Sequence, residues 1–132
     1  MLRGLNHITI AVSDLSSSLA FYTDIVGMVA YVRWDNGAYL SLGGVWFCLS
    51  CDKVVPSQDY SHIALDISEE DFAPFTEKLR NAGVTEWKQN SSEGHSVYFL
   101  DPDGNKLEGH SGSLQSRLSS LKDKPYPGLV WL

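Results

Sequence analysis

The sequence predicts an α+β fold in which one βαβββ module occurs twice. Two similar segments, one beginning at His7 and the other at His62, each join an alternating apolar strand to an amphipathic helix that ends near a glycine. Three further strand-like runs follow each helix. With one polar and one apolar face on every strand, the two modules are expected to form a cupped mixed sheet around a pocket.

The first module covers approximately residues 1–52 and begins with the strand HITIAV. An apolar stripe at helical spacing marks the following helix, which should end near Gly27: Leu15, Leu19, Tyr22 and Val26. The strands MVAYVRW, AYLSL and VWFCLS come next, and DNG and GG supply their turns.

The second module covers approximately residues 53–112 and begins with HIALDI. Its helix carries the matching stripe: Phe72, Phe75, Leu79 and Ala82. Ser68 and Asp71 are typical of a capping box, whereas Pro74 should cost a hydrogen bond unless the helix starts later. The strands VTEWK, SVYFL and NKLEGH follow. Residues 113–132 should add a short helix, with leucines on one face, and a Pro-rich tail: Leu114, Leu118 and Leu121.

Length and composition predict one ordinary globular domain, residues 1–132. The chain is 43% hydrophobic and 20% charged, and its net charge of −6 argues against binding to nucleic acid or an anionic membrane. No apolar run is long enough for a bilayer, and the first residues do not resemble a signal peptide. Cys48 and Cys51 lie too close together for a disulfide framework, so a reducing, cytoplasmic location is expected.

One face of each predicted sheet carries reactive and aromatic side chains. Strand alternation places His7 and Thr9 opposite Ile8 and Ile10, and the second module repeats this pattern around His62. The other strands add several residues to this face: Tyr39, Ser41, Trp46, Cys48, Ser50, Tyr60, Ser96, Tyr98, Lys106, Glu108 and His110. A solvated face would carry more Lys, Asp and Glu, so the composition favours a pocket.

Two histidines and a glutamate suggest a metal site. His7 and His62 occupy equivalent positions in the two modules, and Glu108 follows the turn DPDGNK. Two imidazoles and one carboxylate suit a divalent ion that keeps coordination positions open for a substrate. His95 and His110 lack this symmetry and are interpreted as loop or rim residues.

A polar run, NSSEGHS at residues 90–96, joins two strands that a two-residue hairpin could connect. This loop completes a resemblance to a known family. GLNHITIAVSDL, the tandem order and FLDPDGNKLE resemble the vicinal oxygen chelate (glyoxalase/bleomycin resistance) superfamily. Within it, RWDNGAYLSLG, WFCLS, DYSHIA and WKQNSSEGHSVYFLDPDG are similar to the fosfomycin-resistance glutathione transferases, over residues 2–126.

The resemblance implies a single vicinal-oxygen-chelate domain that adds glutathione to the epoxide of fosfomycin, a small phosphonate antibiotic. It also implies a module-exchanged homodimer with one manganese(II) ion per site, held by His7 of one chain and by His62 and Glu108 of the other. A potassium ion would be bound by oxygens of the polar loop: Asn90, Ser92, Glu93, Gly94 and Ser96.

The resemblance also implies roles in binding the substrates. The phosphonate and epoxide oxygens would be held by a polar set: Thr9, Lys88, Ser92, Tyr98 and Arg117. Trp46, Cys48 and Tyr60 would shape the pocket wall, and Tyr39 would approach the glutathione sulfur. Ser91 replaces a common arginine, Ile63 replaces a frequent aromatic residue, and EGHSG replaces an EAHVG-like run. These departures affect the expected affinity for glutathione, not the metal ligands.

Other functions stay open at the level of sequence. Relatives of the same fold use another thiol or another small epoxide, although the bacillithiol users generally lack the potassium loop. Hydrolytic relatives use a carboxylate base, which AYLSLGGVWFCLS does not contain. An extradiol dioxygenase would need a further base, for which His110 is a thin candidate, and glyoxalase I would need a fourth ligand near Cys48. A non-catalytic, drug-sequestering dimer would keep the fold without the three metal ligands.

Overall fold

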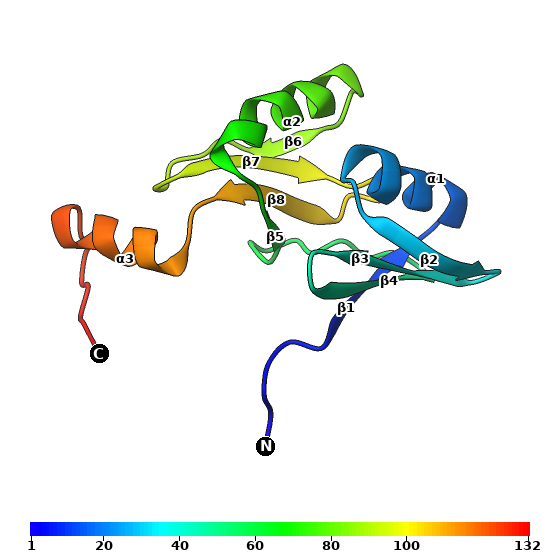
Figure 1. Cartoon of the computed structure of the whole chain (residues 1–132), viewed down its shortest axis with the longest axis horizontal. Coiled ribbons are helices and arrows are strands. Elements are labelled where there is room, and N and C mark those ends of the chain that lie inside the picture. Colours follow the sequence, from blue (N-terminus) through cyan, green and yellow to red (C-terminus); the bar gives the residue numbers. More distant parts are fainter. The chain divides into compact units, whose positions relative to one another are not determined.

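The computed structural model describes residues 1–132 and divides them into two compact units. Unit 1 contains residues 1–61 and 100–105, and unit 2 contains residues 62–99 and 106–132. Each unit holds a four-stranded mixed sheet together with helices (Figure 1). The α+β class and the tandem βαβββ order predicted from the sequence are therefore confirmed.

Unit 1 contains six elements in chain order: β1 (His7–Val12), α1 (Leu15–Ala20), η1 (Phe21–Ile25), β2 (Val29–Trp34), β3 (Gly37–Leu42) and β4 (Val45–Cys51). The strand order is β1-β4-β3-β2. β1 runs parallel to β4, whereas β3 is antiparallel to both of its neighbours. Every residue of β2 is exposed, as befits an edge strand.

The helical segment of unit 1 is not one regular α-helix. Asp14 caps α1 by accepting a hydrogen bond from the Ser17 amide at 2.8 Å, and this bond is the main cause of the lowered pKa of Asp14. The last turn, η1, has π-helical geometry, which the 3.6-residue apolar stripe did not predict. Tyr22 in this turn is completely buried.

A buried phenol fastens the turn at residues 100–105 to this helical segment. The Tyr22 hydroxyl donates to Asp101 Oδ2 at 2.8 Å, and the Asp101 carboxylate also accepts from the amides of Asp103 and Asn105 and from the Asn105 side chain. The Asn105 side chain in turn donates to the Ala11 carbonyl oxygen at 3.1 Å. The DPDGN segment therefore closes unit 1 through side-chain hydrogen bonds.

Unit 2 repeats the same order of elements: β5 (Ile63–Asp66), α2 (Glu69–Asn81), β6 (Glu86–Lys88), β7 (His95–Leu100) and β8 (Lys106–Ser111), followed by α3 (Leu114–Asp123). The strand order is β5-β8-β7-β6, with β5 parallel to β8. Figure 1 shows α2 lying along this sheet. The unit's core is made of apolar side chains from α2, β7 and β8: Leu79, Val97, Tyr98, Phe99 and Leu107.

The ends of the helices follow the sequence closely. Ser68 accepts a hydrogen bond from the Asp71 amide at 3.1 Å and donates to its carboxylate, so the predicted cap of α2 is confirmed. Pro74 lies inside α2, so the alternative that the helix starts later is wrong. Gly27 and Gly83 both have positive φ, which explains why each repeated helix ends before a glycine.

The final helix buries less than its apolar stripe suggests. Leu121 is buried in unit 2, whereas Leu114 and Leu118 remain exposed. Ser113 and Ser116 form a reciprocal capping box at the start of α3. The capping box explains where the helix begins, although the serine pair was not singled out in the sequence.

Strand register confirms the repeat that the sequence predicts. Thr9 pairs with Cys48 between β1 and β4, and Ala64 pairs with Glu108 between β5 and β8. His7 precedes Thr9 by the same number of residues as His62 precedes Ala64. The position equivalent to Glu108 in unit 1 is therefore Cys48, as expected.

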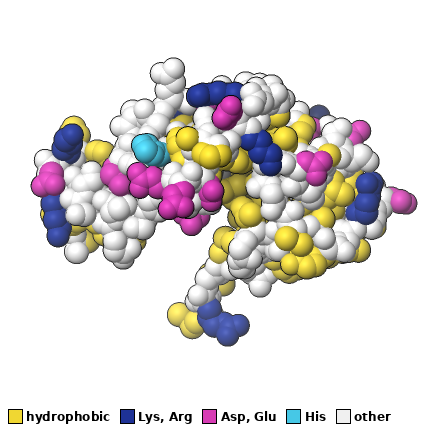
Figure 2. All heavy atoms as spheres, turned by 45° about the horizontal axis from the view of Figure 1, so that its top comes forward, with side chains coloured by type: hydrophobic (Ala, Val, Ile, Leu, Met, Phe, Trp, Pro, Cys, Tyr) yellow, Lys and Arg dark blue, Asp and Glu magenta, His cyan; other side chains and the backbone are white.

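Charges of both signs are mixed on the surface of the protein. On the face shown in Figure 2, Lys and Arg side chains lie singly, many of them beside acidic ones, and form no basic patch. The net charge is −6. None of the helices has both the length and the apolar character needed to cross a membrane.

Replacing Tyr22 with phenylalanine should lower the free energy of unfolding at neutral pH by about 1–3 kcal/mol, because buried Asp101 loses a donor. Urea denaturation would measure this change. Tyr31→Phe is the matched control, since the Tyr31 hydroxyl bonds Ser41 on the exposed edge and its loss should cost little. Equal losses in the two variants would contradict the assignment.

The same pair of variants tests the pH dependence. Burial, and then the charge of Asp101, raises the pKa of Tyr22 above its ordinary value of 10.0. The unfolded chain therefore loses this proton first, so the stabilisation is complete below pH 10 and declines as the pH rises above it. The stability deficit of Tyr22→Phe should shrink above pH 10; a deficit that stays constant would argue against a buried, protonated phenol.

Candidate metal centre

Glu108 is a buried carboxylate in unit 2, on the central strand β8. Only 6% of the residue is exposed. Its Oε2 lies 2.8 Å from His62 Nε2, and its Oε1 accepts a hydrogen bond from Ser96 Oγ at 2.6 Å. Burial of an ionised carboxylate is costly unless each oxygen has a partner, and here both oxygens have one.

Aromatic rings surround the His62 side of this pair. His62 immediately precedes β5, and its ring centroid lies 5.6 Å from Trp87 and 6.1 Å from Tyr98. Trp87 is itself fixed, because its indole N–H donates to the Leu107 carbonyl oxygen at 3.0 Å. The rings restrict the orientation of the imidazole on one side, while the carboxylate holds it on the other.

Two lysines lie over these rings. Lys88 Nζ is 4.9 Å from the centroid of Tyr98, and Lys106 Nζ is 5.3 Å from the ring of Trp87. Such cation–π contacts hold positive charge beside the sheet face that carries Glu108. The structure thus brings together three residues for which the sequence predicts a site role in unit 2, Lys88, Tyr98 and His62.

The third predicted metal ligand, His7, belongs to unit 1. It begins β1, and its ring centroid lies 4.5 Å from that of Trp46, with the two rings tilted by 37°. Its Nδ1 lies 2.7 Å from Asn6 Oδ1, a bond that assigns the proton to Nδ1 and leaves Nε2 available as a ligand. Neither unit by itself gathers three His, Cys, Asp or Glu side chains around one point.

The donor atoms of unit 2 fit a divalent metal ion. An imidazole nitrogen and a carboxylate oxygen that face each other at hydrogen-bonding distance can both become ligands once the shared proton leaves. A nitrogen and oxygen set without thiolate suits manganese(II) among other ions. The His62–Glu108 pair is thus two thirds of the predicted ligand set.

The polar loop closes on itself through Asn90. The Asn90 amide donates to the Gly94 carbonyl oxygen at 2.8 Å, and its Oδ1 accepts from both the amide and the hydroxyl of Ser92. Gly94 adopts φ +79°, and a Cβ there would meet the Ser111 carbonyl oxygen. Three of the five residues predicted to bind potassium therefore lie together.

The other two residues of that set have different partners. Glu93 accepts a hydrogen bond from Arg117 Nε at 3.3 Å, and Ser96 points its hydroxyl to Glu108. The loop is therefore ordered by hydrogen bonds, which argues against an irregular surface connection.

Arg117 is attached to the polar loop. Its Nη2 donates to the Glu93 carbonyl oxygen at 3.1 Å and to Ser92 Oγ at 3.4 Å. Partial burial opposes its charge, but hydrogen bonds and charge interactions with Glu93 and Tyr126 outweigh this effect and raise the pKa of Arg117. The structure therefore places this arginine beside Ser92, another residue of the predicted phosphonate set.

In unit 1 the predicted pocket residues share one face of the sheet. Cross-strand pairing sets Tyr39 opposite Cys48 and Trp46 opposite His7. Tyr39 and Trp46 are each 40% exposed, and their rings meet edge to face at 5.2 Å. Thr9 on the same face is exposed, whereas Cys48 is buried.

Two further unit 1 residues complete this description. Trp34, which was not predicted, extends the aromatic row by packing on Tyr39 at 4.8 Å. Its position next to the DNG turn was the signal that could have revealed it. Tyr60 is exposed and lies outside the strands.

His110 is not the rim residue that the sequence suggested. Its Nδ1 lies 2.7 Å from Ser96 Oγ, and its side chain is only 18% exposed. His95 is exposed but is the first residue of β7 rather than a loop residue, and its ring lies 5.1 Å from Phe72. Strand alternation from Glu108 was the available signal for His110, since it places both on one face.

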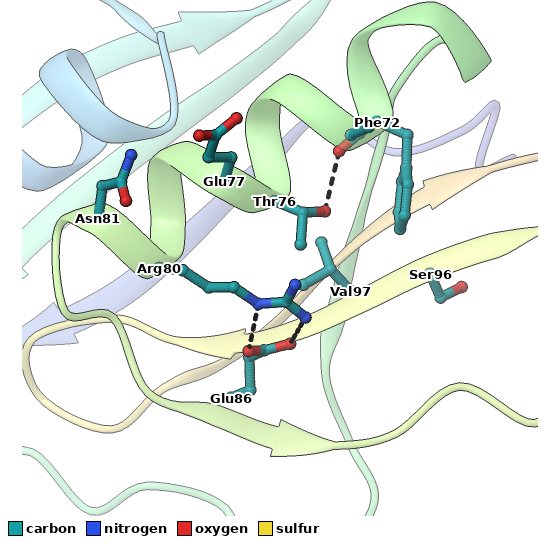
Figure 3. Close-up of a pocket in the computed structure, with 9 residues that line it drawn as sticks. Phe72, Thr76, Glu77, Arg80, Asn81, Glu86, Ser96 and Val97 are labelled. Carbon is teal, nitrogen blue, oxygen red and sulfur yellow. Dashed lines mark hydrogen bonds and ion pairs between the residues drawn. The ribbon is translucent and has the colours of Figure 1, made fainter.

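A separate pocket of about 470 Å³ lies between α2 and strands β6 and β7 (Figure 3). Arg80 crosses it and donates two hydrogen bonds to Glu86, at 3.2 and 3.3 Å. Thr76 donates back to the Phe72 carbonyl oxygen at 2.8 Å. Arg80 and Glu86 are thus engaged with each other, whereas Ser96, which also lines this pocket, directs its hydroxyl to Glu108.

The chain is similar in sequence to known proteins over most of its length. Residues 4–108 match the model of the Glyoxalase/Bleomycin resistance protein/Dioxygenase superfamily. Glutathione transferase FosA of Serratia marcescens is 53% identical, over 99% of this chain and 96% of that protein. Metallothiol transferase FosB of Staphylococcus haemolyticus is 40% identical, over 96% of each.

A solved structure is also similar. The fosfomycin resistance protein FosX of Listeria monocytogenes, in a mutant form complexed with Mn(II) and 1S,2S-dihydroxypropylphosphonic acid, aligns with a TM-score of 0.84. It is 31% identical, and the alignment covers 91% of this chain and 98% of FosX. The same fold therefore accommodates a metal ion and a small phosphonate in that protein.

The chain belongs to the glyoxalase/bleomycin resistance superfamily. More particularly, it belongs with the FosA glutathione transferases, as the resemblance of WKQNSSEGHSVYFLDPDG indicated.

Proposed function

We propose that this protein adds glutathione to the epoxide of fosfomycin and thereby inactivates the antibiotic. The carrying observation is the 53% identity to a FosA glutathione transferase over 99% of the chain. The arrangement of unit 2 supports it, since a paired imidazole and carboxylate lie on the same sheet as an arginine-bound polar loop. The reaction forms a C–S bond, breaks an epoxide C–O bond and leaves a hydroxyl group once the alkoxide oxygen has taken up one proton.

The metal ligands proposed are His62 and Glu108 of one chain and His7 of a second copy. Each unit alone supplies an incomplete set, and the matched register of the two modules makes His7 the equivalent of His62. Manganese(II) is the proposed ion, consistent with the Mn(II) in the FosX structure. When bound, it would supply Lewis acidity toward the epoxide oxygen.

Local cations would bind the phosphonate of fosfomycin. An acidic chain, with a net charge of −6, needs such a cluster because its overall field repels anions. Lys88 lies over Tyr98, and Arg117 donates a hydrogen bond to Ser92. Each of these two cations therefore lies beside a hydroxyl-bearing residue that is also predicted to bind the phosphonate. With Thr9 they would orient the substrate, and their contribution is positioning of the epoxide for attack.

Unit 1 would supply the wall on the thiol side. Tyr39 and Trp46 expose aromatic surface on the face that also carries His7, and Cys48 fills the sheet beneath them. Tyr39 would approach the glutathione sulfur, and Tyr60 would complete the wall. The thiolate attacks an epoxide carbon, and the departing oxygen takes a proton from solvent.

Potassium is proposed as a second cation, bound by loop oxygens of Asn90, Ser92, Glu93, Gly94 and Ser96. Hydroxyl, amide and carbonyl oxygens that already converge around Asn90 support this assignment. The Ser96 hydroxyl donates its proton to Glu108 yet keeps lone pairs that can face a cation. The ion would add positive charge on the phosphonate side.

The second candidate is a related enzyme that uses another thiol or opens the epoxide with water. FosB is named a metallothiol transferase, and the FosX structure holds a dihydroxypropylphosphonic acid. Strands β3 and β4 carry no Asp or Glu, so the hydrolytic base expected from the first module is missing. A drug-sequestering dimer is disfavoured by the retained His62–Glu108 pair.

Purified protein incubated with fosfomycin, glutathione and Mn(II) should form the thioether adduct, faster with potassium than with sodium. Mass spectrometry distinguishes this adduct from the diol and from adducts of cysteine or bacillithiol offered in parallel. The reaction should stop when Mn(II) is removed by a chelator. Unchanged fosfomycin, or diol alone, would defeat the proposed function.

Glu108→Ala should reduce turnover by about a thousandfold or more, because several kcal/mol of Lewis-acid stabilisation are lost with the ligand. Glu77→Gln is the control, since this exposed carboxylate lies on helix α2, which carries none of the proposed ligands. Circular dichroism would verify folding of both variants. Near-normal turnover by Glu108→Ala would show that the metal is held elsewhere.

Mixed dimers test the exchange of modules. His7→Ala and Glu108→Ala homodimers should both be inactive, whereas a heterodimer of the two should regain activity. If the ligands come from different chains, one of its sites carries both changes and the other carries neither. Coexpression with two affinity tags isolates the heterodimer; an inactive heterodimer would mean that each chain supplies a complete set.

A further inference from the structure

A continuous chain of hydrogen bonds runs from His110 to His62 in unit 2. His110 Nδ1 lies 2.7 Å from Ser96 Oγ, and Ser96 Oγ lies 2.6 Å from Glu108 Oε1. The other carboxylate oxygen, Oε2, lies 2.8 Å from His62 Nε2. Strands β7 and β8 and the residue before β5 thus each contribute to one network.

The directions of these bonds follow from the chemistry of the groups. An ionised carboxylate only accepts, so Ser96 must give its single hydroxyl proton to Glu108. The Ser96 oxygen can then only accept from His110, which must carry its proton on Nδ1. His110 is therefore the hydrogen-bond donor at one end of the chain. Ser96 accepts from His110 and directs its own hydroxyl proton at Glu108 Oε1.

Two glycines hold the His110 ring in place. A Cβ on Gly112 would lie 2.7 Å from His110 Nε2, and a Cβ on Gly94 would lie 3.0 Å from its Cε1. Only residues without a side chain permit so close an approach to the ring. Because Gly94 belongs to the polar loop, the conformation of that loop bears directly on His110.

We propose that His110 and Ser96 are positioning residues that set the orientation of Glu108 for metal binding. This inference rests on the proposed function, in which Glu108 is a ligand. Oε1 is engaged by Ser96 and Oε2 faces His62, so Oε2 is the oxygen that would bind the ion. Partners of this kind orient metal ligands in many proteins, and their loss weakens metal affinity.

A purely structural role for His110 makes a different prediction. If the ring only fills space, a substitution of His110 should weaken Mn(II) binding only as far as it destabilises the fold. The position of the N–H donor on the new side chain should then make no difference. If the Nδ1–H bond to Ser96 matters, asparagine should replace histidine, because its amide nitrogen occupies the Nδ1 position. Glutamine places its amide nitrogen near the Nε2 position and should fail.

The test is binding of Mn(II) to metal-free protein, followed by the electron paramagnetic resonance signal of the free ion. His110→Gln and Ser96→Ala should each raise the dissociation constant about 10-fold or more, and His110→Asn should stay close to the wild-type value. Gly112→Ala should also weaken binding, since its Cβ displaces the ring while every polar group is kept. Thermal unfolding monitors the fold of each variant.

Mn(II) binding by Glu108→Ala distinguishes failure of the positioning role from failure of the proposed metal site. Weakened binding in Glu108→Ala with wild-type binding in His110→Gln overturns the positioning role and leaves the metal site standing. Equal losses in His110→Gln and His110→Asn also overturn it. If Glu108→Ala itself binds Mn(II) normally, the proposed metal site is wrong. Should His110→Gln fail to fold, Ser96→Ala and Gly112→Ala decide the question by the same measurement.

Discussion

The buried carboxylate of Glu108 is the constraint around which unit 2 is organised. A charge with 6% exposure is tolerable only when both oxygens are engaged, and their partners come from strand β7 and from the residue before β5. That requires β8 to lie between β5 and β7, which is the observed strand order. The strand order of the sheet is therefore the order that gives both oxygens of the buried carboxylate a partner.

The duplicated frame carries two different surfaces. In unit 1 the position matching Glu108 is Cys48, and an aromatic row of Trp34, Tyr39 and Trp46 occupies the open face. In unit 2 the same face holds the carboxylate and its imidazole partner. One copy of the module thus offers shape and apolar contact, while the other offers charge.

The sequence predicted correctly which face of a strand a side chain occupies, but not which other side chains it contacts. Two-residue alternation placed Trp46 and Glu108 on the correct sides, because the pleat alone determines side-chain direction. It could not reveal that Ser96 bridges Glu108 and His110, since that depends on which strands become neighbours and on side-chain rotamers. Arg117 came only from the family resemblance, because a helix in a sequence does not show which loop it meets.

The residues around Asp101 tie the two halves of the sequence together within unit 1. The segment 100–105 lies far along the sequence from α1 yet belongs to unit 1, where its carboxylate receives the Tyr22 hydroxyl. A fragment ending at residue 61 would bury that phenol without an acceptor, at a cost of about 1–3 kcal/mol. Unit 1 is therefore not a self-contained stretch of sequence, because the acceptor for its buried phenol comes from the second half of the chain.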